Sequence, residues 1–468
     1  MLPKFRLLTL LVCLVSLFPY CSKKAIPTPI ADEEPAPVPE QGEDQSDTEE
    51  PSASLEKLIL TADAKGRWVI DGETQQYDCN VTIAIKEGQY NSIVVRNLTG
   101  RSGCPIRIEN DGLVEFVGYR KTMSISDVSH VIITGDGTKG LDKGFLFRDN
   151  EYRSVSLNGA INHFTFQHIE FSNIGNRVIN YSNELIYDGS ANSYAENLKF
   201  LNLTATNTGV LLYITGSVKN GTLSGLVRKL EIADVHFKDA PSPKNVVYVG
   251  LAEDYDIHHN TFTNVNKEND NHNAMFHLIG NGKFYNNRIS HHQGNALRAW
   301  AVSVGTTPRQ IHIYNNIVTD SRKYSAFEVQ SFVDFIIPGK TTYANAKVYH
   351  NTCGNLNLSR DWYGVVLDAY RLLGGTCEIY NNLAYNFPAP HPKNNIISYM
   401  SIESENLRES NNVYYNSAQA AGLADQTSFK LRATSSVINT GAQPTGLSYD
   451  FYDKTRNANT PTVGAVEY

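Results

Sequence analysis

Three stretches of the sequence share one pattern: residues 313–321 read IYNNIVTDS, residues 348–356 VYHNTCGNL and residues 379–387 IYNNLAYNF. They align without gaps, with an asparagine at the fourth position and apolar residues on both sides of it. Their starts lie 35 and 31 residues apart. Self-similarity with a period of about 30 residues indicates a solenoid in which each repeat forms one coil.

Further copies extend this pattern toward both ends of the chain. The sixth residues of the copies form an anchor series: Phe171, Phe200, Phe237, Phe262, Ile289, Val318, Cys353, Ala384 and Tyr414. The copies alternate apolar and polar residues and are rich in β-branched, aromatic, Asn and Gly residues, which favours strands joined by turns. Amphipathic runs of ten or more residues, which a helical solenoid would need, are absent from residues 55–468.

An asparagine recurs at one position of the repeat, in Asn260, Asn287, Asn316, Asn351, Asn382 and Asn412. Asn tolerates the left-handed backbone of tight turns, and equivalent amides one coil apart can hydrogen-bond in a row. We interpret this series as structural, because turn chemistry explains it fully.

These repeats resemble the single-stranded right-handed parallel β-helix of the pectate-lyase-like superfamily. Residues 83–110, IAIKEGQYNSIVVRNLTGRSGCPIRIEN, are similar to the first coils of that group, and residues 449–468, YDFYDKTRNANTPTVGAVEY, resemble its closing segment. The resemblance implies an all-β solenoid of about ten or more coils over residues 55–468. It is specific for the fold and almost silent on the substrate.

The first 54 residues differ from this body. Residues 1–21 have the basic, apolar and cysteine order of an export leader, and Cys21 with the following SKK resembles the lipidated start of Bacteroidota lipoproteins. Residues 22–54 contain six prolines and nine acids against two lysines, which predicts a disordered tether. We therefore expect export and a lipid anchor in the outer membrane, on its periplasmic or cell-surface side.

Net charge limits the partners of the body. The leader carries +2 and the tether −7, so about −2 of the total of −7 remains for residues 55–468. A nearly neutral body has no global field for nucleic acid, and an acidic glycan would have to be held by local basic groups. We expect a monomer whose only membrane contact is the lipid anchor.

The body contains four cysteines: Cys79, Cys104, Cys353 and Cys377. Export permits disulfides, and the simplest of three pairings joins Cys79 to Cys104 and Cys353 to Cys377. Buried free thiols are the alternative, above all for the second pair. Metal-ligand spacing of Cys and His is absent, so we predict no zinc site.

A second series of short strands precedes the repeat copies. Its outward positions are expected to be Tyr187, Tyr213, Tyr248, His277, Arg298, Glu328 and Leu367, with Trp300 and Gln330 beside them. Adjacent coils lie about 4.8 Å apart, so neighbours in this series can touch. Aromatic rings beside a cation are what an acidic sugar chain would need, which predicts Tyr187, Tyr213, Trp300 and Gln330 as substrate-binding residues.

Elimination from a uronic acid requires a cation for the carboxylate, a base, and a proton donor for the leaving oxygen. Arg298 could hold the carboxylate, His277 could act as the base and Tyr248 as the donor. Glu328 would then orient Arg298. Plain alternatives remain: tyrosines that only stabilise the sheet, an ordinary Arg298–Glu328 ion pair, and a surface histidine.

The position of Arg298 resembles that of the catalytic arginine in the chondroitinase B and alginate lyase family. The catalytic lysine of that family is not matched, because His277 occupies the aligned position and Lys283 is expected in a turn. A calcium-assisted mechanism would need clustered outward acids, for which Glu268 and Asp270 are weak candidates.

Hydrolysis requires two carboxylates facing one bond. The outward series supplies Glu328, and Asp361 could reach in from a loop, whereas Asp368 is expected to point inward. Arg360, Asp361 and Trp362 in that loop could bind or cover a glycan. The leading hypothesis is a lyase for a uronate-containing glycan; the alternatives are a non-catalytic glycan-binding or structural lipoprotein and, third, a glycoside hydrolase.

Overall fold

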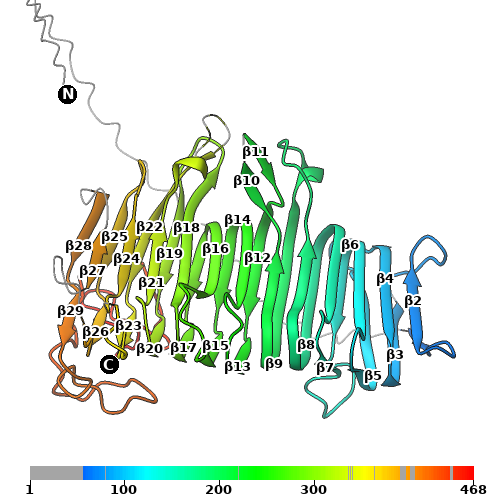
Figure 1. Cartoon of the computed structure of the whole chain (residues 1–468), viewed down its shortest axis with the longest axis horizontal. Helices are drawn as coiled ribbons and strands as arrows, with labels where there is room; N and C mark the ends of the chain where they lie inside the picture. The colour runs from blue at the N-terminus through cyan, green and yellow to red at the C-terminus, as the bar shows by residue number, and fades with distance from the viewer. Residues whose placement is uncertain are drawn as a thin grey trace, which may run out of the picture. The chain divides into compact units, whose positions relative to one another are not determined.

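The computed structural model describes residues 56–468 apart from residues 80, 220, 336, 338, 340, 363, 390–396, 401–405 and 443–445. The expected leader, Cys21 and the tether lie outside the described residues. Within them, 27 strands join one continuous sheet, and its strands pair in parallel from one coil to the next; a short antiparallel pairing joins residues 302–304 to residues 341–343. The fold is the expected right-handed parallel β-helix. Figure 1 shows its strands side by side, from β2 in blue to β29 in orange.

The first coils are built from long strands that bend from one face of the coil to the next. Strand β9, for example, pairs along its length with β12, then β13, then β14. These strands are β1 (Glu56–Leu60), β2 (Arg67–Asp71), β3 (Val81–Gln89), β4 (Ser92–Thr99), β5 (Ile106–Val117), β6 (Thr122–Thr134), β7 (Phe145–Asn150), β8 (Val155–Ser182) and β9 (Ala195–Ile214).

The later coils have three distinct faces, which we number in chain order. Face 1 consists of β12 (Val227–Ala233), the second half of β14 (Val247–His258), the second half of β16 (Ala274–Tyr285), β19 (Arg309–Tyr314), β22 (Thr341–Tyr349), β25 (Cys377–Tyr380) and β28 (Leu407–Ser410). Face 2 consists of β13 (His236–Ala240), β15 (Thr261–Val265), β17 (Arg288–His292), β20 (Ile317–Ser321), β23 (Thr352–Gly354), β26 (Leu383–Tyr385) and β29 (Val413–Tyr415).

Face 3 carries the predicted site. It consists of the first halves of β14 and β16, then β18 (Asn295–Val304), β21 (Phe327–Gln330), β24 (Leu367–Tyr370) and β27 (Ser398–Met400). Outside the three faces lie the hairpin β10 (Ser217–Lys219) and β11 (Thr222–Ser224) and two 3-10 turns, Ala191–Ser193 and Val333–Phe335.

The anchor series is the inward column of face 2. Seven of its nine members, from Phe237 to Tyr414, are cross-strand partners coil by coil. Phe200 was assigned wrongly: it pairs with Phe166 on face 1, and the residue in register with Phe171 is Ala205. The copy that starts at residue 195 is a face 1 strand, which has a similar alternation of apolar and polar residues.

The asparagine series forms a continuous ladder at the turn between face 1 and face 2. Each Nδ2 donates to the Oδ1 of the next ladder residue at 2.8 to 3.0 Å. Asn316, for example, also donates to the carbonyl of Phe284 in the preceding coil, and its Oδ1 accepts the backbone N–H of Asn287. The left-handed residue is the one before each ladder asparagine, such as Asn315 with a φ of 52°.

The four cysteines of the body form one disulfide and leave two free thiols. Cys79 and Cys104 form the expected disulfide, whereas Cys353 and Cys377 are buried free thiols, so the simplest pairing is wrong for the second pair and the alternative of free thiols is confirmed. The two residues lie on different faces, Cys353 in β23 and Cys377 in β25.

The closing segment packs back onto the ladder turn, where buried Arg456 donates to Asn315 and to Glu467.

The ladder predicts a graded loss of stability along the solenoid. Replacing fully buried Asn316 with Ala leaves backbone groups of two coils unsatisfied and should lower the free energy of unfolding by roughly 3 kcal/mol. Asn412→Ala, at the partly exposed end of the ladder, should cost about 1 kcal/mol. Denaturant unfolding followed by circular dichroism checks both values. Equal losses would contradict a ladder that is tightest at its buried centre.

Candidate functional site

Face 3 brings most of the predicted site residues into one outward column. Cross-strand pairing joins, in order, Asn180, Tyr213, Tyr248, His277, Arg298, Glu328 and Asp368. Trp300 and Gln330 are partners in the neighbouring outward position, as expected. The column therefore runs along the solenoid axis with one side chain in each coil.

Two members of the expected series do not belong to this column. Tyr187 lies in the loop after β8, where it packs near Tyr194 and its hydroxyl accepts a bond from Arg228; Asn180 occupies its expected place. Leu367 is fully buried and points inward, so Asp368 is the outward residue next to Glu328. A shift of one residue in the alignment of this strand exchanged its two faces.

The aromatic residues of the column offer few open ring faces. Tyr213 and Tyr248 stack on each other with ring centroids 4.9 Å apart, and the guanidinium of Arg177 lies 3.8 Å from the Tyr213 centroid. Trp300 is enclosed by His277 and Phe332. The predicted stacking platform for sugars is therefore largely used up by contacts within the protein.

His277 does not have the geometry of a base. Its side chain is 6% exposed, and burial, with a smaller effect of Arg298, lowers its pKa to about 3. Asn245 accepts the backbone N–H of Ala274 through Oδ1, so its Nδ2 must donate to Nδ1 of His277. The proton of this neutral imidazole then sits on Nε2, which is enclosed and has no partner among the described residues.

A buried charge cluster occupies the next coils. Nε of Arg298 donates to Oε1 of Glu328, and Nε2 of His272 lies 2.7 Å from the other carboxylate oxygen. Glu328 has no exposed surface, whereas the side chain of Arg298 is 19% exposed. Arg298 thus holds the Glu328 carboxylate where solvent does not reach it, whereas Nε2 of His272 hydrogen-bonds to Oδ1 of Asn295 at 3.0 Å and Oε2 of Glu328 has no hydrogen-bond partner among the described residues.

Asp368 differs from Glu328 although the two are cross-strand neighbours. It is half-buried, and burial together with the negative charge of Glu328 raises the pKa of Asp368 to about 7. His272 and Arg298 oppose this shift but do not cancel it. The column therefore contains one carboxyl group that changes its charge near neutral pH.

The predicted loop residues reach the charge cluster through an aromatic chain. Trp362, which is 40% exposed, packs against Tyr324, and Tyr324 stacks on His272 with centroids 4.4 Å apart. Asp361 pairs with Lys323 at 3.2 Å rather than with the column, so it is not a second carboxylate for Glu328. Arg360 is exposed at the edge of this loop.

Among the described residues, no three His, Cys, Asp or Glu side chains are grouped to hold a metal ion. Asp270 forms an ion pair with Arg322 at 2.6 Å. Across the same residues, the structure has no helix with the length and apolar character that a membrane span requires.

The chain has similarity to known proteins only among solved structures. No family model and no curated protein matches the sequence. The similar solved structures include a pectate lyase, Pel9A, with a TM-score of 0.44, 12% identity, and coverage of 84% of this chain and 89% of that one. An alginate lyase from Paenibacillus sp. str. FPU-7 gives 0.38, 13%, 75% and 99%, and the PL6 family polysaccharide lyase Pedsa3628 from Pseudopedobacter saltans gives 0.34, 10%, 87% and 99%. Identities this low carry no information on reaction or substrate.

The sequence did not predict the positions of three residues in or near the candidate sites. Asp368 was assigned inward, His272 lies in a loop that has no repeat pattern, and Lys283 is not in a turn but in β16 between Asp256 and His312. Strict alternation could have identified Lys283 and Asp368, since Phe284 and Leu367 beside them are apolar and point inward. Sequence spacing gave no signal for His272.

Replacing a carboxyl group of the column with the corresponding amide should have opposite effects on stability at Asp368 and at Glu328. Folded Asp368 keeps its proton up to about pH 7, whereas the unfolded chain releases it near pH ~4, so the folded state loses stability as pH rises through this window. Asp368→Asn removes that loss and should stabilise the protein by on the order of 2 kcal/mol at pH 8.

Glu328→Gln is the matched control, one coil away. It leaves Arg298 in a buried site without its counter-charge and should destabilise by roughly 3 kcal/mol. Denaturant unfolding at pH 5 and pH 8 measures both variants. Destabilisation by Asp368→Asn at pH 8 would disprove the proposed protonation behaviour.

Proposed function

We propose that the protein binds a uronate-containing polysaccharide on face 3 and cleaves it by β-elimination. The observation that carries this proposal is the order of the column, in which Arg298 and Asp368 flank the buried carboxylate of Glu328. One of these groups is a permanent cation, and the other is a carboxyl group that titrates near neutral pH. These are the two charges that elimination beside a carboxylate requires.

Arg298 would neutralise the carboxylate of the sugar. Its Nε is bonded to Glu328 and its NH1 to the carbonyl of His272 at 3.3 Å, which fixes the plane of the guanidinium. Among the described residues its NH2 has no partner. A fixed guanidinium with a remaining donor suits recognition of a carboxylate and would stabilise the charge that develops on it during the reaction.

Asp368 would act as the base in place of His277. Because Arg298 bonds to Glu328, its guanidinium lies near the coil of Glu328, about 4.8 Å in strand spacing from Asp368. Asp368 takes the proton from the carbon beside the carboxylate, the electron pair forms the carbon–carbon double bond, and the bond to the glycosidic oxygen breaks. That oxygen takes a proton from solvent, since Tyr248 lies four coils from Asp368.

Hydrolysis is the second candidate, because Glu328 and Asp368 form the pair of neighbouring carboxyl groups that the sequence had not indicated. Both groups of such a pair must face the glycosidic bond. Glu328 is fully buried beneath Arg298 and His272, so elimination fits the accessible groups better. A glycan-binding protein without catalysis would use the same Arg298 and differ only in the role of Asp368.

We further propose that the protein is exported and held at the outer membrane by a lipid on Cys21. The support is the order of the leader and the acidic, proline-rich composition of residues 22–54. Such a tether would let a monomeric body reach polysaccharide near the membrane.

Elimination creates a double bond conjugated to a carboxylate, which absorbs ultraviolet light. With a panel of uronate-containing polysaccharides, we expect the rate of absorbance increase to rise about tenfold per pH unit below pH 7 and then to level off, because Asp368 must be ionised. Asp368→Asn should lower kcat at least 100-fold with little change in binding. Arg298→Ala should lower both kcat and the affinity for the polysaccharide.

His277→Gln supplies the control, since His277 is enclosed and takes no part in the proposed step. It should retain the pH profile of the unmodified protein. If His277→Gln abolishes product formation while Asp368→Asn does not, the assignment of the base is wrong. Binding without product across the whole panel would leave the non-catalytic alternative.

A further inference from the structure

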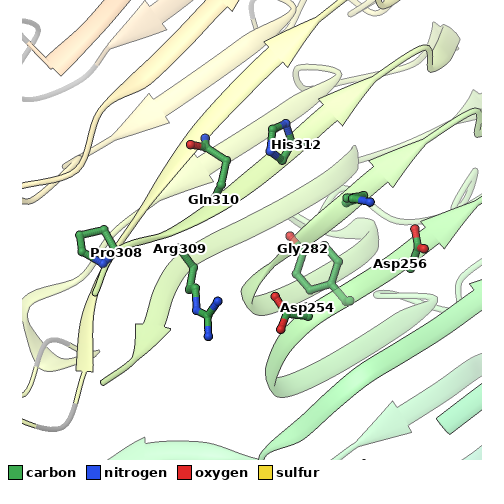
Figure 2. A pocket seen from close by; sticks show the side chains of 9 residues that line it. Asp254, Asp256, Gly282, Pro308, Arg309, Gln310 and His312 are labelled. Carbon is green, nitrogen blue, oxygen red and sulfur yellow. The ribbon is translucent and has the colours of Figure 1, made fainter. Parts of the chain in front are cut away.

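A groove of about 500 Å³ lies on face 1, away from the column of face 3. Asp256, Lys283 and His312 project into it from equivalent positions of β14, β16 and β19, and Arg309 lines it from the start of β19. Figure 2 labels Asp256, Arg309 and His312 among the side chains that line the groove. With Asp254, five ionisable side chains therefore meet in one hollow that the proposed reaction does not use.

The cations of this groove are unusual for their column. Elsewhere in the same column the lysines are neutralised: Lys199 pairs with Glu231 at 2.6 Å and Lys347 with Glu378 at 3.5 Å. Lys283 and Arg309 are both exposed, and within the described part of the chain neither has an ion-pair partner. Asp254 and Asp256 in the same lining balance the formal charge, so the two unpaired cations favour a ligand that offers an anionic group together with hydrogen-bond donors.

Asp256 supplies the opposite kind of contact. Although Lys283 is its cross-strand neighbour, Asp256 forms no ion pair with it, and Oδ1 of Asp256 is enclosed without a hydrogen-bond partner among the described residues. Burial raises the pKa of Tyr285, and the negative charge of Asp256 adds to this shift. The hydroxyl of Tyr285 also hydrogen-bonds to the Asp256 carboxylate, which no cation among the described residues neutralises through an ion pair.

Neutral hydrogen-bonding groups complete the lining. Burial, assisted by Lys347 and Lys283, lowers the pKa of His312, and its Nδ1 lies 3.2 Å from the hydroxyl of Tyr349. Tyr285 and Tyr314 stack beside the groove with centroids 4.8 Å apart. Because stacked rings cover each other's faces, the Tyr285–Tyr314 pair presents ring edges and hydroxyl groups rather than a surface on which a sugar could stack.

We propose that the face 1 groove is a second saccharide site, which binds an anionic sugar unit. Lys283 and Arg309 hold its carboxylate or sulfate, and Asp256 accepts a hydrogen bond from a hydroxyl of the same unit. This ligand class matches the lining because a sugar acid carries an anion and several hydroxyl donors on one ring. The site is independent of the proposed elimination, since it shares no residue with face 3.

The test uses a variant in which the proposed site on face 3 is disabled, so that binding to the face 1 groove can be measured. A full-length chain carrying Arg298→Ala and Asp368→Asn is titrated by calorimetry with tetragalacturonate, a sulfated chondroitin tetrasaccharide and neutral cellotetraose. We expect the anionic probes to bind and cellotetraose to bind at least tenfold more weakly. The carboxylate and sulfate arms show which anion the groove prefers.

Adding Lys283→Ala and Arg309→Ala should weaken binding of the preferred anionic probe at least tenfold. Lys199→Ala with Lys229→Ala is the matched control, because it removes the same charge from two cations that are paired with acids and should leave the affinity unchanged. Equal loss in both double variants, undiminished binding after the groove substitutions, or equal affinity for cellotetraose would overturn the proposal. None of these outcomes depends on whether face 3 has lyase activity.

Discussion

The asparagine ladder is the interaction on which the geometry of the later coils depends. Each ladder amide before the terminal Asn412 donates to the coil before it and to the coil after it, so one side chain connects three coils. The amides are buried, and a coil displaced by one residue would leave several polar groups unsatisfied. The ladder therefore fixes the register of all three faces, although it lies only at the turn between faces 1 and 2.

Fixed register turns the repeat into columns, and the chemistry of the protein follows from columns rather than from local motifs. Arg298, Glu328 and Asp368 are 30 and 40 residues apart in sequence, yet they are successive neighbours on face 3. The same rule gives face 1 its row of Asp256, Lys283 and His312. A solenoid can thus assemble a charged site without a short sequence motif, because spacing along the axis is set by the sheet itself.

Burial then assigns different roles to similar groups. Glu328 and Asp368 are neighbouring carboxyl groups, but His272 and Arg298 enclose the first, while the second is left half-buried with a raised pKa. Among the lysines of face 1, Lys199 and Lys347 are neutralised by acids, and Lys283 is not. In both places the informative feature is the group whose charge the protein does not compensate.

The sequence by itself determined the β-helix, the inward column of face 2 from Phe237 onward and the outward positions of Tyr213 to Glu328, because alternation and a 30-residue period record which side of a strand is buried. The prediction failed at Tyr187, which lies in a loop of similar composition, and at Asp368, where the alignment was displaced by one residue although the strand alternates. Only the tertiary structure decided that His277 is enclosed, that Cys353 and Cys377 lie on different faces, and that Lys283 is uncompensated. Enclosure and charge pairing depend on loops and neighbouring coils, and no local sequence pattern encodes those contacts.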